Sequence, residues 1–373
     1  MTGGPERASD TLIIGAGAVG ASIAFHLAQS GVGVRVLERD AGPERRATST
    51  RSFGLVWAQS KAPNAYLELS LASVSAYPAL LAELGDDCSY ERPGGMLLIE
   101  TEEQERGLRA LMAEQQLTSG FEVRFLDARE MRELDPALSD RLLGATFSPH
   151  DGHLDPRRLV DALTVAAVRH GAVLDRGVEV TRIAPRGAAW VVETTVGTYS
   201  AGSVVNAAGV WAREIASRSG VDLPVDEVRG QVVVSDVRPR LLHHPTPDVR
   251  QAPDGRVWMG TVHERDDWDL APRASDTARI LSMAARLVPA LAGVTVERVW
   301  AGLRAIPRDG FPIAGPVPGQ PGHFVAVTHS GITLAAVLGP LMRDLITSGN
   351  VPPQLQGFGL ERESLRGLVR AAH

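Results

Sequence analysis

The sequence has 373 residues but only one lysine, Lys61, and one cysteine, Cys88. A single cysteine excludes an internal disulfide and a cysteine-rich metal centre. The adjacent His243 and His244 have no further ligands at metal-binding spacing, so a loop is favoured there and no metal site is expected. No apolar run approaches the roughly 18 to 20 residues that span a bilayer, and no cationic, apolar signal sequence opens the chain. We therefore expect a cytoplasmic protein without a membrane span.

Positive charge is almost entirely arginine, scattered through the chain rather than gathered in a basic tract, and the formal net charge is -6. Nucleic acid and anionic membranes are therefore not expected as partners. Hydrophobic residues at 44% and charged residues at 22% are ordinary for a folded enzyme, and nothing in them excludes a homo-oligomer. Two domains are expected, because one core rarely grows beyond about 250 to 300 residues.

The stretch 11–40 predicts a strand, a glycine-rich turn, a helix, a second strand and an acid. Glycines at this spacing allow a tight turn, close approach of the backbone to a pyrophosphate, and close packing of helix on strand. Glu38 follows about 20 residues on, where a carboxylate accepts hydrogen bonds from ribose hydroxyls. The unit predicts an adenine dinucleotide, and the acid disfavours NADP. It does not distinguish FAD from NAD. The residues expected to contact the dinucleotide here are Gly15, Gly17, Ala18, Val19, Gly20, Glu38 and Arg39, although Arg39 is also compatible with a surface position.

The remaining pattern predicts an α/β protein with a Rossmann-type domain made of separated segments. Helical spacing favours helices at 65–84, 102–116, 156–170 and 333–346. Between 226 and 262 the pattern changes from apolar runs that alternate with helices to strands joined by Pro and Asp-Gly turns, which indicates an antiparallel sheet. We expect a dinucleotide domain from 1–88, 150–222 and 298–373, and an inserted α+β substrate domain from 89–149 and 223–297.

Four segments resemble the FAD-dependent D-amino-acid oxidase superfamily, and within it glycine oxidase and the sarcosine oxidase-like enzymes. They are "ATSTRSFGLV", "HGAVLDRGVEV", "VVNAAGVWA", and the pair "WAGLRAIPRDGFPIAG" and "VTHSGITLAAVLGPLMRDLI". The resemblance runs over nearly the whole chain and implies a glutathione-reductase-like FAD-binding domain. The cofactor contacts it implies are Thr48, Ser49, Phe53, Gly54, Leu55, Val180, Ala208, Gly209, Arg304, Ser330, Gly331, Ile332, Thr333 and Leu334.

The resemblance also implies a substrate site beside the flavin. Arg304 occupies the family's arginine position, and its planar fork can hold a carboxylate through two hydrogen bonds. Where glycine oxidase has a tyrosine and a second arginine, this chain offers Asp248 and His329. We expect these three residues and Leu55 to face the substrate, in a pocket that differs from that of glycine oxidase.

Two further features separate the chain from the sarcosine oxidases. Their flavin is attached through a cysteine in the C-terminal half, where this chain has none, so noncovalent FAD is expected. Those enzymes also use a lysine near the ring to favour reaction with oxygen. Lys61 is the sole candidate here, and it lies in a different segment, so we do not expect it at the ring.

Three interpretations of function remain open. The first is an FAD enzyme that oxidises the C–N bond of a small amino acid or N-substituted glycine to an imine, by hydride transfer to flavin N5, with oxygen as acceptor and hydrogen peroxide as by-product. The second is a dehydrogenase that passes electrons to a partner or quinone. The third is a noncatalytic module that binds the dinucleotide as a structural or sensing ligand.

Overall fold

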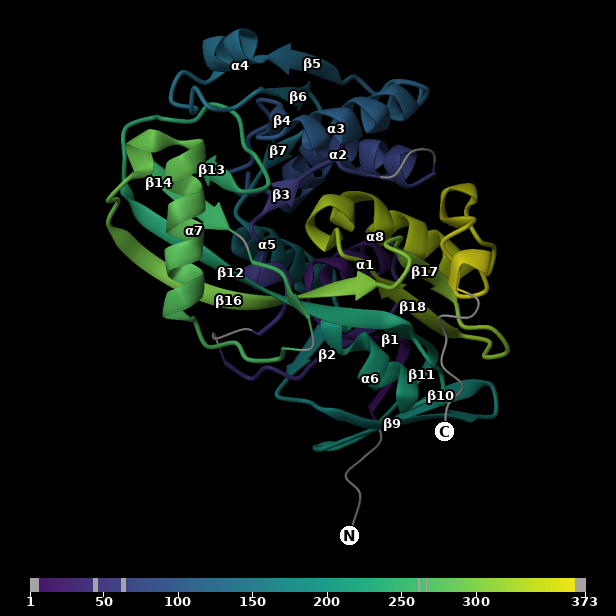
Figure 1. Cartoon of the computed structure of the whole chain (residues 1–373). Coiled ribbons are helices and arrows are strands. Elements are labelled where there is room, and N and C mark those ends of the chain that lie inside the picture. The colour runs from purple at the N-terminus through teal and green to yellow at the C-terminus, as the bar shows by residue number, and fades with distance from the viewer. Residues whose placement is uncertain (1–6, 43–45, 62–64, 261, 266, 366–373) are drawn as a thin grey trace.

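The computed structural model describes residues 7–42, 46–61, 65–260, 262–265 and 267–365. Its largest sheet runs in the order β17-β18-β11-β1-β2-β8, and the hairpin of β9 and β10 extends it from β11 (Figure 1). The strands of this sheet are β1 (Arg7–Ile14), β2 (Val34–Glu38), β8 (Val173–Arg176), β9 (Val180–Arg186), β10 (Ala189–Thr194), β11 (Gly197–Asn206), β17 (Ile313–Pro316) and β18 (His323–Val327).

The predicted strand-turn-helix-strand unit is confirmed. Its two apolar strands pair in parallel, with Ile14 opposite Leu37. Helix α1 (Ala18–Gln29) starts directly after Gly17 and is buried along almost its whole length. A strand that is apolar on both sides is expected where helices cover both faces of a sheet. The carboxyl ends of β1 and β2 therefore meet at one edge, where α1 begins.

Three further helices pack with α1 into the main core. These are α2 (Ala65–Leu84), α5 (Pro156–Arg169) and α8 (Gly331–Ser348), close to the predicted ranges. Helix α5 begins sharply because the Asp155 carboxylate caps its first N–H groups and Pro156 is its first residue. Helix α8 packs against both α1 and α2, and it ends at Gly349 in the left-handed conformation.

One helix, α2, is the candidate to compare with the expectation that no apolar run approaches bilayer-spanning length. Its 20 residues have a mean hydropathy of 1.2, enough by length and composition alone to cross a membrane. Half of that stretch is buried inside the protein, against α8 among other elements. A core helix of this length meets the same criterion, and burial explains why α2 is so apolar.

The antiparallel part consists of a five-stranded sheet, a three-stranded sheet and the helices beside them (Figure 1). The five-stranded sheet contains β12 (Val225–Val237), β13 (Val249–Gln251), β14 (Arg256–Gly260), β15 (Glu264–Arg265) and β16 (Val296–Pro307). The three-stranded sheet contains β4 (Gly95–Ile99), β5 (Arg124–Asp127) and β6 (Gly144–Ser148). The remaining elements are β3 (Leu55–Val56), β7 (Gly152–His153), α3 (Glu102–Gln115), α4 (Ala128–Leu134), α6 (Ala212–Ser217) and α7 (Ala274–Leu287).

Strands β12 and β16 pair along most of their length and connect the two parts of the molecule (Figure 1). Their far ends bury side chains against α7, whereas Leu303 and Ala305 pack near the large sheet. The domain boundary expected at 298 therefore falls inside β16. Because these long strands belong to both parts, the antiparallel part and the large sheet are held in a fixed relation.

Candidate active site

A cavity, open to solvent and with about 1080 Å³ of empty space including its open mouth, runs along the carboxyl ends of β1 and β2 and on to the start of α8. This is the edge of a parallel sheet where cofactors of such folds bind. Most of the expected site residues line it, namely Gly15, Gly17, Ala18, Val19, Glu38, Arg39, Thr48, Ser49, Val180, Ala208, Gly209, His329, Gly331 and Ile332. Gly20, Phe53, Gly54, Leu55, Asp248, Arg304, Ser330, Thr333 and Leu334 do not line it.

The glycine turn forms one end of the cavity. Gly15 has a φ of +103°, and a Cβ there would lie 2.7 Å from the Ala207 carbonyl oxygen. At Gly20 a Cβ would lie 2.0 Å from the Gly15 oxygen, so this glycine lets α1 pack onto the turn rather than touch a ligand. Gly17 exposes its backbone to the cavity, at the N-terminus of α1. The arrangement suits a pyrophosphate, which favours a helix N-terminus.

The carboxylate of Glu38 is fixed at the rim of the same end. One oxygen accepts a hydrogen bond from the Ala16 N–H and the other from the Asp40 N–H, both at 2.9 Å. Arg39 is not a plain surface residue, since its guanidinium lies 4.5 Å from the ring centroid of Trp211 and both line the cavity. No sequence pattern singled out Trp211 beyond its place two residues after Gly209.

The segment expected to cross the flavin is clamped by its neighbours. Ser49 Oγ accepts from the Ala18 N–H at 3.0 Å. Thr333 Oγ1 accepts from the Trp57 N–H at 3.1 Å and donates to the Leu55 carbonyl at 3.3 Å. Gly54 has a φ of +81° where a Cβ would meet the Leu154 oxygen at 2.3 Å. Thr333 and Gly54 thus hold the segment in place, while Leu334 is buried in the core.

Arg304 lies on β16 next to Ala305, which lines the cavity. Burial lowers the pKa of its guanidinium to about 10, so it is still a cation at neutral pH. One of its terminal nitrogens donates to the Val262 carbonyl oxygen at 2.5 Å. A neutral carbonyl is a weaker partner for arginine than a carboxylate is. The planar guanidinium is thus of the type that binds a carboxylate through charge-assisted hydrogen bonds.

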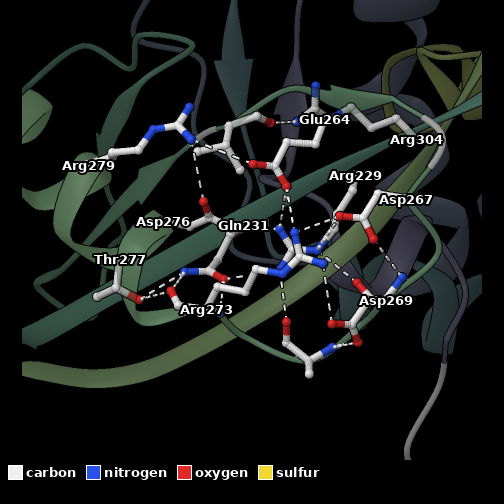
Figure 2. A network of polar contacts seen from close by, with 12 residues as sticks. Arg229, Gln231, Glu264, Asp267, Asp269, Arg273, Asp276, Thr277, Arg279 and Arg304 are labelled. Atoms are coloured by element: carbon white, nitrogen blue, oxygen red, sulfur yellow. Dashed lines mark hydrogen bonds and ion pairs between the residues drawn. The ribbon is translucent and has the colours of Figure 1, made fainter.

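The Val262 carbonyl belongs to a segment, described over residues 262–265 and 267–273, that several ion pairs hold in place (Figure 2). Arg229 of β12 is fully buried and donates to Asp276 of α7 at 2.7 Å and to the Asp269 carbonyl at 2.7 Å. Arg273 pairs with Glu264 at 3.0 Å, and its distance to Asp267 is 2.7 Å. We call Arg229, Glu264, Asp267, Arg273 and Asp276 the anchor network. It fixes the loop that Arg304 contacts.

His329 lines the cavity two residues before α8 begins. Burial lowers its pKa to about 3, and the neighbouring Lys61, Arg304 and His263 act in the same direction. The imidazole is therefore neutral at physiological pH. It can exchange hydrogen bonds with a ligand, but it does not replace the charge of the arginine that it matches in glycine oxidase.

Lys61, for which the sequence predicted no place at the ring, reaches the start of α8. Its ammonium donates to Ser330 Oγ at 2.8 Å, and the residue is 8% exposed. Ser330 follows His329 and directly precedes α8, so Lys61 stands behind the cavity wall. The chain between β3 and α2 turns back towards α8, a long-range contact that separation in sequence does not reveal.

The structure does not bring Asp248 to Arg304 and His329. Burial raises the pKa of its carboxyl to about 6, and the charges that act on it are those of Glu100 and Arg286, which pair with each other beside α7. Its backbone carbonyl accepts from the Gly260 N–H in the β13–β14 hairpin. Asp248 thus belongs to the antiparallel part. Its match to the tyrosine of glycine oxidase does not place it in the pocket.

The other reactive side chains lie elsewhere. Cys88 is buried outside the cavity, and burial raises the pKa of its thiol to about 12. His244 binds Asp135 through Nδ1 at 2.9 Å, and the His243 N–H also donates to that carboxylate. Among the residues that the structure describes, no cluster of three metal-ligating side chains occurs.

Fold and cavity together define an oxidoreductase that binds an adenine dinucleotide. The model of the DAO family, described as FAD dependent oxidoreductase, matches residues 10–345, and the chain belongs to this family. Its cofactor is FAD. The observed site fits this cofactor, with backbone at Gly15 and Gly17 for the pyrophosphate and the fixed Glu38 for the ribose. The family membership also excludes a noncatalytic module: the chain is an enzyme that acts on CH–NH2 or CH–NH donors.

Similar proteins come from several bacteria. The chain is 31% identical over 364 residues to a subunit of the opine oxidase of Agrobacterium tumefaciens (strain Ach5), covering 95% of this chain and 97% of the relative. It is 30% identical over 402 residues to hydrogen cyanide synthase subunit HcnC of Pseudomonas aeruginosa, covering 95% and 96%. The crystal structure of glycine oxidase from Geobacillus kaustophilus superposes with a TM-score of 0.90 at 30% identity, covering 96% of this chain and 99% of that one.

Proposed function

We propose that this enzyme oxidises the C–N bond of a small amino acid or N-substituted glycine to an imine. The observation that carries the proposal is Arg304, a half-buried cation beside the cavity wall, whose guanidinium donates to the Val262 carbonyl among its contacts. A carboxylate placed there gains two charge-assisted hydrogen bonds. Bound noncovalently, FAD supplies the hydride acceptor for the substrate α-carbon. Arg304, His329 and Leu55 remain the expected contacts of the substrate.

The residues of the site act by binding and by excluding water. Arg304 orients the carboxylate, and the anchor network fixes the segment whose Val262 carbonyl contacts Arg304. His329, uncharged, offers a hydrogen-bonding nitrogen without repelling the amine. Hydride leaves with the electron pair of the C–H bond, so the amine must be neutral, and its proton goes to solvent. No side-chain base is demanded, and the imine then hydrolyses in water.

For the electron acceptor we propose oxygen, which yields hydrogen peroxide. A second candidate is a partner protein or quinone. It is favoured by two relatives that cover nearly the whole chain and are named as subunits of larger enzymes, an opine oxidase and a hydrogen cyanide synthase. A subunit of a larger enzyme can pass electrons to its neighbour instead of to oxygen.

An anaerobic screen tests the proposed reaction. Amino acids, N-methylglycine and other N-substituted glycines are mixed with the yellow enzyme, and loss of flavin absorbance is followed. We expect bleaching by at least one compound that carries both an amine and an α-carboxylate, and none by its ester or amide. If the ester bleaches the flavin as fast as the acid, the carboxylate clamp is wrong. If no amine bleaches it, the proposed function fails.

The acceptor is tested by mixing the bleached enzyme with oxygen in a stopped-flow instrument. Rapid return of the yellow colour with one peroxide formed per flavin supports the oxidase. Reoxidation that is slow with oxygen but fast with a quinone analogue supports the second candidate.

A further inference from the structure

Lys61 is an unusual lysine because its charged end points inward. Lysine is among the side chains least often buried, since desolvation of an ammonium costs free energy unless the charge is compensated. Here the described contacts of the ammonium are the Ser330 hydroxyl, at 2.8 Å, and the face of the Tyr66 ring, 5.5 Å from its centroid. Neither of these two contact partners is charged, although the buried Asp151 carboxyl interacts with the Lys61 charge through space. The position of this cation therefore calls for a function.

The segment that carries Lys61 is rigid. The Lys61 N–H donates to the Ala58 carbonyl at 3.0 Å. The amide of Gln115 donates to the carbonyls of Gln59 and Lys61 at 2.7 and 2.9 Å. The buried Asp151 carboxyl accepts from the Ala58 and Gln59 N–H groups. A lysine stem in such a frame has little freedom to swing out to solvent.

The hydroxyl that receives the ammonium stands at the N-terminus of α8. Ser330 occupies the capping position, yet its side chain caps none of the helix N–H groups. Its Oγ lies instead between Lys61 and the Tyr66 hydroxyl, at 2.8 Å from each. The first residues of the helix, Gly331 and Ile332, line the cavity together with His329. The partial positive charge of the helix terminus and the full charge of Lys61 therefore add at one wall of the cavity.

We propose that Lys61 is a positioning residue for the cofactor: held by Ser330 behind the start of α8, it stabilises negative charge on the flavin ring and raises the reduction potential of bound FAD. The inference rests on the flavin ring lying at this end of the cavity, as the proposed function requires. His329 supplies no charge here, and the glycine end of the cavity holds the other half of the dinucleotide. Lys61 thus adds a fixed positive charge directly behind the helix terminus, whereas Arg304 is the cation assigned to the substrate carboxylate.

The test uses the purified holoenzyme without any amine. Two quantities are measured: the two-electron reduction potential of the flavin against reference dyes, and the dissociation constant of sulfite, an anion whose addition to flavin leaves negative charge on the ring. For Lys61→Met we expect sulfite to bind about 30-fold more weakly. This ratio corresponds to the loss of the Coulomb attraction between the negative ring and a unit positive charge several ångströms away, in a medium of intermediate dielectric constant. The same ratio corresponds to a potential about 45 mV lower. Lys61→Arg retains the charge and should recover most of both values.

Matched variants separate charge from structure. Tyr66→Phe removes the uncharged partner of the same Ser330 hydroxyl, and it should leave the potential and the sulfite affinity within about twofold of the parent. If Lys61→Met does not retain FAD, the potential and the sulfite affinity are measured on Lys61→Gln instead, since this variant keeps a hydrogen-bond donor for Ser330. The proposal is overturned if the uncharged variants bind sulfite as the parent does. Because no substrate is involved, this result is independent of the amine screen.

Discussion

The two ends of the cavity are built in different ways. The dinucleotide end comes from one continuous unit, in which Gly15, Gly17 and Glu38 act mainly through backbone geometry and a fixed carboxylate. At the reacting end, Arg304 comes from β16, His329 precedes α8, and Lys61 comes from the segment before α2. The first end is shaped by steric fit, which tolerates little change. The second is shaped by buried charge, which can be tuned residue by residue.

The largest effect is expected where a side chain is added at the dinucleotide end. Gly15→Val places a branched side chain at a φ of +103°, against the Ala207 carbonyl at 2.7 Å. Both the strain and the clash oppose the turn on which the pyrophosphate is expected to rest. We expect protein without flavin or no folded protein, measured as the FAD content per chain after purification.

The control for that change is Gly31→Ala. Gly31 also has a positive φ, +85°, but nothing lies within 4 Å of a Cβ there. Its cost should be limited to backbone strain, about 1 kcal/mol, with full FAD content. Full flavin in Gly15→Val would show that the turn does not hold the cofactor.

The next effect concerns the reacting end. Arg304→Lys keeps a positive charge but loses the planar fork, so it should lower kcat/KM for carboxylate substrates about 100-fold, mainly through KM, while FAD stays bound. Steady-state kinetics with the substrate found in the anaerobic screen give the two constants. Arg298→Lys, an exposed position on the same strand, is the matched control. An unchanged KM for Arg304→Lys would remove Arg304 from the clamp.

The contrast between the two ends also explains which parts of the fold and of the site can be predicted from the sequence. Gly15, Glu38 and the helix that follows were predictable because their spacing is local and each has a steric or hydrogen-bonding reason. The helices at 65–84 and 156–170 were predictable from apolar periodicity and, for α5, from Asp155 and Pro156. The residues expected at Arg304 and His329 came only from a resemblance in the C-terminal segments. Their exact roles remain proposals.

What could not be predicted depends on contacts between distant segments. Lys61 reaches Ser330 across 269 positions, and no pattern near residue 61 indicates it. The amphipathic α7, which joins the anchor network through Asp276, was not expected. Asp248 was matched by sequence position alone, although its carboxyl faces Glu100 and Arg286. A one-residue change of register moves a strand side chain to the opposite face, so such matches are fragile.

The smallest expected effect is a pH dependence of the unfolding free energy that comes from a buried carboxyl at the reacting end. Asp151 is fully buried beside the Lys61 segment, and burial raises the pKa of its carboxyl from 3.8 to about 7. The folded state therefore holds the proton more tightly than the unfolded chain does, so this group's contribution to stability is largest below about pH 4 and is lost as the pH rises through about 7. Asp151→Asn removes that dependence, at the cost of altered hydrogen bonds to Ala58 and Gln59.

The parent should lose about 2 to 3 kcal/mol of unfolding free energy relative to Asp151→Asn between pH 5 and pH 8. Urea unfolding of both proteins at the two pH values, with FAD present, gives the difference. Asp254→Asn, in the exposed turn between β13 and β14, controls for the loss of a carboxylate as such. If the difference between parent and Asp151→Asn is the same at both pH values, Asp151 keeps its charge throughout. The reacting end would then hold a permanent carboxylate beside Lys61, and the net positive charge behind α8 would be smaller than the contacts of Lys61 imply.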